Sequence, residues 1–224
     1  MMKGATMAAG DQERKVLPMT DLLIRQVPWW KRVMDVMGAL AALIFFGPFM
    51  LLTALAVKLT SGGPVIFRQL RAGLGGRPFV MYKFRSMCDR AEEKRDELCA
   101  AGELARPAFK MKDDPRVTPV GRFIRRWSID EMPQFWNVLT GEMSLVGPRP
   151  LPVEDTSGFA QWQRWRLTCV PGLTCFWQTS GRSEVPFDDW ARMDIRYRRE
   201  CSPLTDLKIL ILTPGAVLSR KGAY

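Results

Sequence analysis

Residues 36–57 read VMGALAALIFFGPFMLLTALAV, a run of 22 residues without a charged side chain between Asp35 and Lys58. A helix rises about 1.5 Å per residue, so this run is long enough to cross a hydrocarbon layer of about 30 Å. It begins too late in the chain, and it is too long, for a cleaved secretory signal. The run therefore predicts a helix embedded in a membrane.

Two features of this run argue against a simple crossing. Pro48 follows Gly47 near the middle, where a proline removes a backbone hydrogen bond and bends a helix. Lysines and arginines flank both ends, which favours having both ends on the cytoplasmic side. We expect a re-entrant helix over 29–60 that is broken at Pro48, with Trp29 and Trp30 in the interface where the helix enters. A single-pass helix that tolerates the proline is the main alternative, and a buried helix of a soluble core is another.

The remaining sequence predicts an α+β, mostly helical chain in three parts. These are an N-terminal segment at 1–28, the membrane helix at 29–60 and a folded domain at 61–224. Residues 64–84 hold two extended apolar runs on either side of a glycine cluster, a pattern typical of a small β-hairpin. Residues 89–104 are rich in Glu, Lys, Arg and Ala and predict a solvated helix.

Three further segments combine apolar and basic side chains. Residues 121–127 place Phe123, Ile124 and Trp127 on one helical face and arginines on the other. Residues 159–167 alternate tryptophans with arginines, and 204–218 are strongly apolar but interrupted by charges and a proline. We expect amphipathic helices that lie in the membrane interface. A basic face exposed over a soluble core is an equal alternative.

Composition narrows the chemistry. The 33 Lys and Arg against 23 Asp and Glu give a net charge of +10, which indicates a polyanionic partner such as nucleic acid, anionic lipid or a phosphorylated substrate. The chain has no histidine, which excludes a Ser-His triad and a His-ligated zinc site. Its five cysteines show no C-x-x-C spacing, and we interpret them as reduced thiols.

The densest chemical signal is SIDEMPQFWNVL at 128–139, followed by Gly141. Ser128 and Glu131 have the spacing of a capping box, which predicts a helix that begins there and ends near Gly141. Asp130 and Glu131 would then lie at a helix N-terminus, where the helix dipole favours negative charge, phosphate or a bound cation. The alternative is that the two acids only cap the helix.

Several cations surround this acidic pair in the sequence. Arg125 and Arg126 precede it by about one helical turn, and Arg149 follows it in the motif GPRP at 147–150. Arg182 and Lys83 add two more cations beside turn residues or on a predicted strand. Arginine binds phosphate oxygens well. A carboxylate pair among arginines, without histidine, indicates metal-assisted phosphoryl transfer.

These motifs belong to an ordered set that covers nearly the whole chain, from about Trp30 to Tyr224. In that order the sequence resembles the bacterial sugar transferase family, the monotopic polyprenyl-phosphate phosphoglycosyltransferases. One block alone would be weak, whereas the ordered set is specific. The blocks are KRVMD at 31–35, YKFRSM at 82–87, DPRVT at 114–118, DEMPQ at 130–134, MSLVGPRP at 143–150, PGLT at 171–174, WQ at 177–178 with GR at 181–182, and DLKIL at 206–210.

The resemblance implies a small, catalytic-core enzyme on the cytoplasmic face of the bacterial inner membrane, with 61–224 as its catalytic domain. Asp130 would attack the β-phosphate of a UDP-sugar, release UMP and pass the phosphosugar to undecaprenyl phosphate. Mg²⁺ bound at Asp130 would neutralise the diphosphate. This reaction is the first membrane step of exopolysaccharide or glycoconjugate synthesis.

The resemblance also implies roles for the residues around Asp130 and Glu131. By position, Arg125, Arg149 and Arg182 would hold phosphates, and Lys83 would steady the acidic pair or the substrate. Gln178 would contact the sugar or the nucleotide.

Residues 220–224 are similar to members that transfer hexose 1-phosphate, which favours glucose or galactose. The chain departs from the family at Cys175 and Phe176, where many members have a glycine after PGLT, and this change alters one wall of the site.

Two other functions fit parts of the sequence. A membrane-tethered binder of nucleic acid or anionic lipid would use the basic charge, but no nucleic-acid motif is present and the acidic pair would have no purpose. A catalytically inactive scaffold would not need the acidic pair with its arginines. We therefore expect an enzyme that acts with UDP-sugar, undecaprenyl phosphate and membrane lipid, and not with nucleic acid. The sequence leaves the oligomeric state open, with a homodimer among the alternatives.

Overall fold

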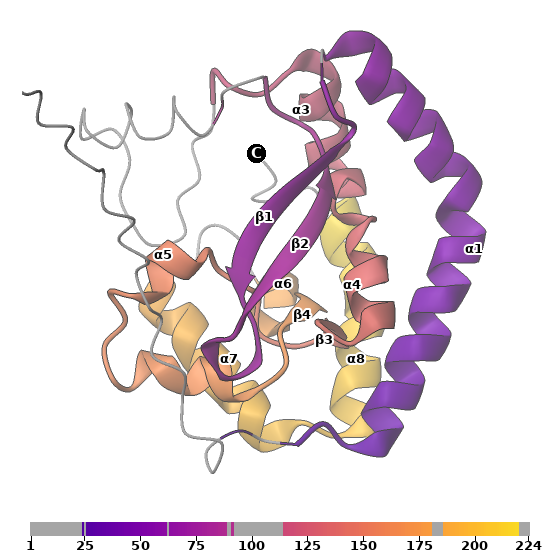
Figure 1. Ribbon diagram of the computed structural model, residues 1–224. Helices are drawn as coiled ribbons and strands as arrows, with labels where there is room; N and C mark the ends of the chain where they lie inside the picture. Colours follow the sequence, from indigo (N-terminus) through magenta and orange to yellow (C-terminus); the bar gives the residue numbers. More distant parts are fainter. Residues whose placement is uncertain are drawn as a thin grey trace, which may run out of the picture.

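The computed structural model describes residues 24, 26–61, 63–88, 91, 114–180 and 186–219. Its longest element is α1 (Trp29–Thr60), a helix of 32 residues with Pro48 inside it. Figure 1 shows α1 as one bowed helix along the side of the domain. The expected break at Pro48 is therefore wrong as an interruption of the helix, because the proline removes one N–H donor while its neighbours continue the helix.

Most of α1 is not covered by the domain. It is the one helix, among the residues described, that is long and apolar enough to cross a membrane, and its most apolar window is 11% buried. Large side chains such as Ile44, Phe45 and Leu51 are more than two-thirds exposed. This surface is compatible with a monotopic membrane protein.

Both ends of α1 attach to the same folded body. Near the first end, Lys31 is buried and donates to the Val146 carbonyl (2.8 Å) and to the Asp206 carboxylate (2.5 Å). At the last turn, Val57 packs with Phe84, Ile124 and Ile129 in one hydrophobic cluster. The middle of the helix bows outward between these two attachments (Figure 1).

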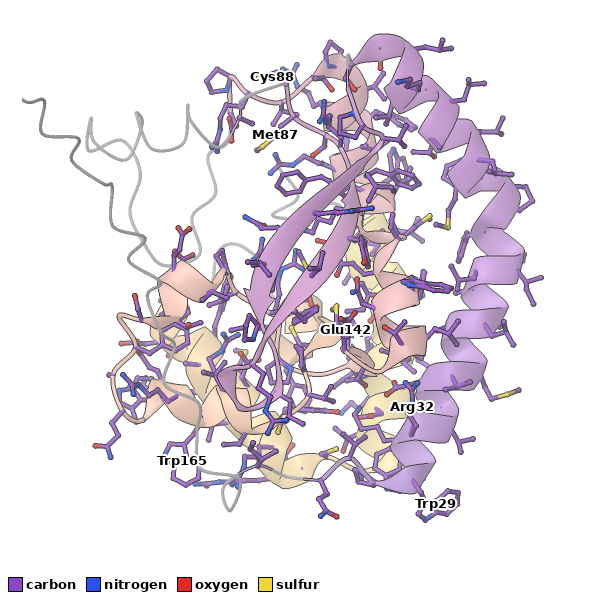
Figure 2. The ribbon with its side chains drawn as sticks, in the orientation of Figure 1. Trp29, Arg32, Met87, Cys88, Glu142 and Trp165 are labelled. Atoms are coloured by element: carbon purple, nitrogen blue, oxygen red, sulfur yellow. The ribbon has the colours of Figure 1, made fainter. Side chains whose placement is uncertain are left out.

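Figure 2 shows how the first turns of α1 meet the domain. Trp29 projects away from the protein and is 78% exposed. Arg32 turns toward α4 (Gln134–Thr140) and donates to the carbonyls of Val138 (2.7 Å) and Leu139 (2.6 Å). A cation at these carbonyls stabilises the end of α4, where the helix dipole is negative.

The predicted hairpin is confirmed. Strands β1 (Ile66–Ala72) and β2 (Pro78–Phe84) pair antiparallel, from Ile66 opposite Phe84 to Ala72 opposite Pro78. The turn between them contains a short 3-10 segment, η2 (Leu74–Gly76). Its Gly75 and Gly76 have φ of 67° and 77°, which a residue with a Cβ rarely adopts. The glycine cluster therefore closes the turn as expected.

The expected capping box is wrong. Ser128 has φ 56° in the left-handed region and its side chain caps no helix, while α4 begins only at Gln134. The acidic pair lies instead in η3 (Ile129–Glu131), a 3-10 turn between α3 (Pro119–Arg126) and α4. The reason is tertiary, because Glu131 binds two cations from other elements rather than a backbone amide. The predicted stop is confirmed, since Gly141 ends α4 with φ 91°.

The C-terminal half surrounds a second, parallel pair of short strands. Strand β3 (Ser144–Val146) pairs with β4 (Gly172–Thr174), and Gly147 and Gly172 approach so closely that a Cβ at Gly172 would lie 2.0 Å from the Gly147 nitrogen. The surrounding helices are α5 (Val153–Thr156), η4 (Gln163–Thr168), α6 (Phe176–Ser180), α7 (Phe187–Glu200) and α8 (Pro203–Leu218).

The predicted amphipathic segments differ in outcome. Residues 159–167 do not present a uniformly basic surface, because Arg166 is 2% exposed and pairs with Asp194 inside the protein. In contrast, α8 exposes a row of apolar side chains that includes Leu204 and Ile211, and a location in the membrane interface stays a prediction for it. The helix predicted at 89–104 falls, apart from Ala91, outside the described residues.

Candidate active site

The acidic pair lies on the side of the domain that faces α1. Ile129, the first residue of η3, packs with Val57 of α1, and Met132 borders the same hydrophobic cluster. Ser128 lets the chain turn sharply from α3 into η3 through its left-handed backbone. The two carboxylates are thus held on a tight turn beside α1.

Glu131 is fixed by two cations. Lys83 of β2 donates to its Oε1 (3.0 Å), and Arg149, from the loop after β3, donates to both of its oxygens, with 3.2 Å from Nη1 to Oε2. Burial alone would raise the pKa of Glu131, but Arg149 and Lys83 hold it well below its usual range. Glu131 is therefore a permanent anion whose position is set by two salt bridges.

Asp130 has a different environment. Its residue is 8% exposed, and within the described part of the chain no group donates a hydrogen bond to its carboxylate. Burial raises the pKa of Asp130 to about 6, which Lys83 and Arg125 oppose and the charge of Glu131 reinforces. The result is a buried carboxylate that is ionised at neutral pH, more basic than usual and not occupied by another side chain.

Burial and the charge of Glu131 also shift the pKa values of Lys83 and Arg149. Burial lowers the pKa of the Lys83 ammonium, and the attraction of Glu131 opposes that effect. The pKa of Arg149 lies above its usual value because the attraction of Glu131 outweighs its burial. The charge of Glu131 thus favours the charged form of both cations, which hold Glu131 between them.

Arg125 supplies a cation that, unlike Lys83 and Arg149, forms no salt bridge to Glu131 within the described residues. It lies in the last turn of α3, and its charge opposes the rise in the pKa of Asp130. Within the described ranges its guanidinium forms no ion pair. Arg125 is thus placed to receive an anion next to Asp130.

The two remaining predicted residues are not placed against the pair. Gln178 lies on α6, where its Oε1 accepts from the Cys175 thiol (3.0 Å), and the charge of Arg149 acts on that thiol. Gln178 is therefore linked to the Arg149 loop through Cys175. Arg182 falls outside the described residues.

The residues present are compatible with Mg²⁺ only if the substrate contributes ligands. In the part of the chain that is described, no group of three or more His, Cys, Asp or Glu could hold a metal ion. Magnesium is commonly bound by one or two carboxylates together with substrate phosphates and water. Asp130 offers a carboxylate that has no hydrogen-bond partner among the described residues, so its donor chemistry fits such a shared site.

Sequence reasoning missed two buried ion pairs outside the acidic pair. Arg166 and Asp194 pair with side chains that are each 1% exposed, and Lys31 and Asp206 form a similar pair at 4% and 2%. The partners are 28 and 175 residues apart in the chain, so no local spacing connects them. Arginine and lysine in these segments were expected at the surface.

The fold and site define a membrane-compatible, mostly helical protein whose carboxylate pair is surrounded by cations suited to phosphate. The family described as bacterial sugar transferase matches residues 26–220, and the chain belongs to that family. The resemblance seen in the sequence is thus confirmed.

Curated relatives agree with this family. The chain is 43% identical to the galactosyl transferase CpsE of Streptococcus agalactiae, covering 86% of this chain and 43% of that protein. It is 41% identical to the UDP-glucose:undecaprenyl-phosphate glucose-1-phosphate transferase of Escherichia coli, over 87% of this chain and 41% of that protein. With the exopolysaccharide production protein ExoY of Rhizobium meliloti it shares 38% identity over 87% of this chain and 88% of that protein. The chain thus spans less than half the length of the first two relatives.

Proposed function

We propose that this protein transfers a sugar 1-phosphate from a UDP-sugar to undecaprenyl phosphate. The observation that carries the proposal is the division of the acidic pair, with Glu131 fixed by two salt bridges and Asp130 without a hydrogen bond from any residue that the structure describes. A nucleophile must be unoccupied and basic, and Asp130 meets both conditions. The names of the relatives supply the donor and acceptor classes, and their galactose and glucose favour a hexose.

In the first step an oxygen of Asp130 attacks the β-phosphorus of the UDP-sugar. A bond forms between that oxygen and phosphorus, the bond from the β-phosphorus to the bridging oxygen breaks, and UMP leaves with that oxygen. The sugar phosphate remains on Asp130 as an acyl phosphate. Because the Asp130 carboxylate is poorly hydrated, little solvent must be removed before the attack.

In the second step an oxygen of undecaprenyl phosphate attacks the same phosphorus. The bond between phosphorus and Asp130 breaks, the carboxylate is restored, and the lipid carries a diphosphate sugar. The two steps share one nucleophile and give ping-pong kinetics. The position of η3 beside α1 supports access to Asp130 for a phosphate carried by a membrane lipid.

The surrounding cations stabilise the negative charge that develops during both steps. Arg125 is suited to binding a substrate phosphate directly, while Arg149 and Lys83 add positive charge and are positioned by Glu131. Arg182 and Gln178 stay proposed phosphate and sugar or nucleotide contacts. Mg²⁺ held by Asp130 and the diphosphate would neutralise charge on the leaving UMP.

The attachment of α1 supports a re-entrant path, with the site on the cytoplasmic face. Lys31 at one end and Val57 at the other are both buried against one domain, so a helix that crossed the bilayer would have to release one end. Basic residues at both ends favour the cytoplasmic side. Labelling of an Ala5→Cys variant in intact cells tests this path. Modification by an impermeant reagent from outside the cell would refute it.

The reaction is tested by UMP release from purified protein in nanodiscs with Mg²⁺, undecaprenyl phosphate and a panel of UDP-sugars. We expect release with one or two hexose donors, loss of release in Asp130→Asn, and normal release in Asp189→Asn, whose carboxylate is half exposed on α7. Donor labelled in the sugar should remain bound to wild-type protein when the acceptor is left out. Failure of every donor to release UMP would refute the enzymatic proposal and favour the scaffold.

A further inference from the structure

The loop that carries Arg149 is held by hydrogen bonds along its length. Residues 147–151 leave β3, and hydrogen bonds hold the loop to β4, to the hairpin and to η4. These bonds run from Gly147 N to Thr174 O (2.9 Å), Gly172 N to Pro148 O (2.9 Å), Arg71 Nη1 to Pro150 O (3.1 Å), Ala72 N to Leu151 O (2.9 Å) and Arg166 Nη2 to Arg149 O (2.8 Å). The last of these bonds acts on Arg149 itself.

Arg149 is therefore held at two points of one residue. Its guanidinium binds Glu131, and its backbone carbonyl accepts from Arg166. Pro148 and Pro150 flank Arg149 and restrict the backbone, but neither has a backbone N–H that could donate to the Arg149 carbonyl. The position of the Arg149 side chain thus depends on where Arg166 holds that carbonyl.

Arg166 is itself fixed by one carboxylate. Its Nε and Nη2 both donate to Asp194 Oδ2, at 2.9 and 2.7 Å, and the two side chains are each 1% exposed. Asp194 comes from α7 and Arg166 from η4. One guanidinium therefore connects α7 to the Arg149 loop.

The charge of Asp194 explains how two guanidinium groups can lie near each other. Arg166 Nη2 lies 2.8 Å from the Arg149 carbonyl oxygen, so the Arg166 guanidinium lies beside the residue that carries the second one. Asp194 neutralises Arg166 and allows it to approach the cationic loop. A buried ion pair is often no more stabilising than an apolar pair of equal volume. An apolar pair, however, could not donate to the Arg149 carbonyl.

We propose that Arg166, held by Asp194, is a positioning residue that sets Arg149 against Glu131 and the substrate diphosphate. This inference rests on the proposed function, because it takes the diphosphate of a UDP-sugar as the group that Arg149 binds. Neither Arg166 nor Asp194 contacts the reacting atoms. Their effect on substrate passes through Arg149.

The test separates positioning from folding by using UDP binding and thermal unfolding in nanodiscs. Arg166→Met combined with Asp194→Leu replaces the ion pair with an apolar pair that lacks the donor to Arg149. We expect a midpoint of unfolding close to wild type and a Kd for UDP that rises about 10–100-fold, because small displacements of binding groups have effects of that size. In an Arg149→Ala background the same pair of substitutions should change the Kd less than about twofold.

A second variant covers the case in which the apolar pair does not fold. Arg166→Lys keeps the positive charge beside Asp194, but one ammonium replaces the planar fork that reaches both partners. It should weaken UDP binding in the wild-type background and have little effect in Arg149→Ala. Equal weakening in both backgrounds, or a wild-type Kd in either variant, would overturn the positioning role.

UMP release, measured in parallel, keeps the two proposals apart. In one outcome, wild type releases no UMP, and the effect of the Arg166 substitutions on UDP binding disappears in Arg149→Ala. This outcome refutes the enzymatic function and retains the positioning role. UMP release by wild type with additive effects on UDP binding refutes the positioning role alone. Wild-type protein that binds no UDP at millimolar concentration contradicts both.

Discussion

The two carboxylates of the site should affect stability in opposite directions when each is neutralised. Asp130→Asn and Glu131→Gln are isosteric changes at adjacent positions of one 3-10 turn. Asp130 is buried as an anion to which no described residue donates a hydrogen bond, and burial raises its pKa, so its charge destabilises the fold. Glu131 is held by Lys83 and Arg149, so its charge stabilises the fold. We therefore expect Asp130→Asn to stabilise and Glu131→Gln to destabilise the protein.

The size of the first effect follows from the pKa of Asp130. The value is raised from 3.8 to about 6, a change of about 2 units, and each unit corresponds to about 1.4 kcal/mol. Because the folded-state pKa is raised, the cost of the charge is fully present above pH 6, decreases as the pH falls and is absent below 3.8. Asp130→Asn should thus raise the free energy of unfolding by about 3 kcal/mol at pH 8 and by only about 0.5 kcal/mol at pH 4.

The second effect has the opposite sign and a similar size. Glu131 has a side chain that is 16% exposed, and removing its charge leaves Lys83 and Arg149 without their counterion. Loss of one partner from a buried pair costs about 3–5 kcal/mol. The pKa of Glu131 lies well below its usual value, so this stabilisation is present at neutral pH and is lost only in strong acid.

Scanning fluorimetry of tryptophan emission in nanodiscs at pH 8 and pH 4 measures both effects. A change of about 3 kcal/mol corresponds to a shift of about 6–12 °C in the unfolding midpoint of a chain this size. Asp189→Asn, at a half-exposed position, should leave the midpoint unchanged and serves as the control. Midpoints that move in the same direction for the Asp130 and Glu131 variants would refute the assignment of opposite environments.

Three further predictions concern the site and its supports. The kcat/KM for the UDP-sugar should fall about tenfold between pH 7 and pH 5, because Asp130 must be ionised to attack and its pKa is about 6; a limb near pH 4 would contradict this. Gly172→Ala should lower the free energy of unfolding by about 3 kcal/mol, since its Cβ would meet the Gly147 backbone at 2.0–2.6 Å, whereas Gly158→Ala has open space and should be neutral in the same melting experiment. Lys31→Met should destabilise the protein by about 3–5 kcal/mol by leaving its carboxylate partner on α8 buried and unpaired, and a wild-type midpoint would show that this attachment of α1 is dispensable.

Local features of the fold were predictable because short stretches of sequence determine them. The hairpin follows from two extended runs around a glycine cluster, and Gly75 has the positive φ that such a turn needs. The end of α4 follows from Gly141, which has φ 91°. The length and apolar character of α1 follow from residues 36–57 alone. Each depends on neighbours within one or two helical turns.

The sequence also identified the residues from which the site is built, but not how they are divided. Asp130 and Glu131 were identified as an acidic pair. The cations Lys83, Arg125 and Arg149 were identified in the motifs around that pair. Their proposed roles in binding and catalysis stay predictions. Nothing in the adjacent letters D and E distinguishes an occupied carboxylate from an unoccupied one.

Tertiary structure alone decided that division, because it depends on contacts between distant parts of the chain. Lys83 is 48 residues from Glu131, and their salt bridge replaced the capping box that local spacing had suggested. Arg166, which a helical pattern placed at the surface, is buried because Asp194 on another helix neutralises it. Burial and ion pairing are properties of the packed protein, since the cost of removing a charge from water and the partner that compensates for it both come from elsewhere in the fold. The sequence by itself therefore determined which groups are available for chemistry, and packing determined which of them is left without a partner.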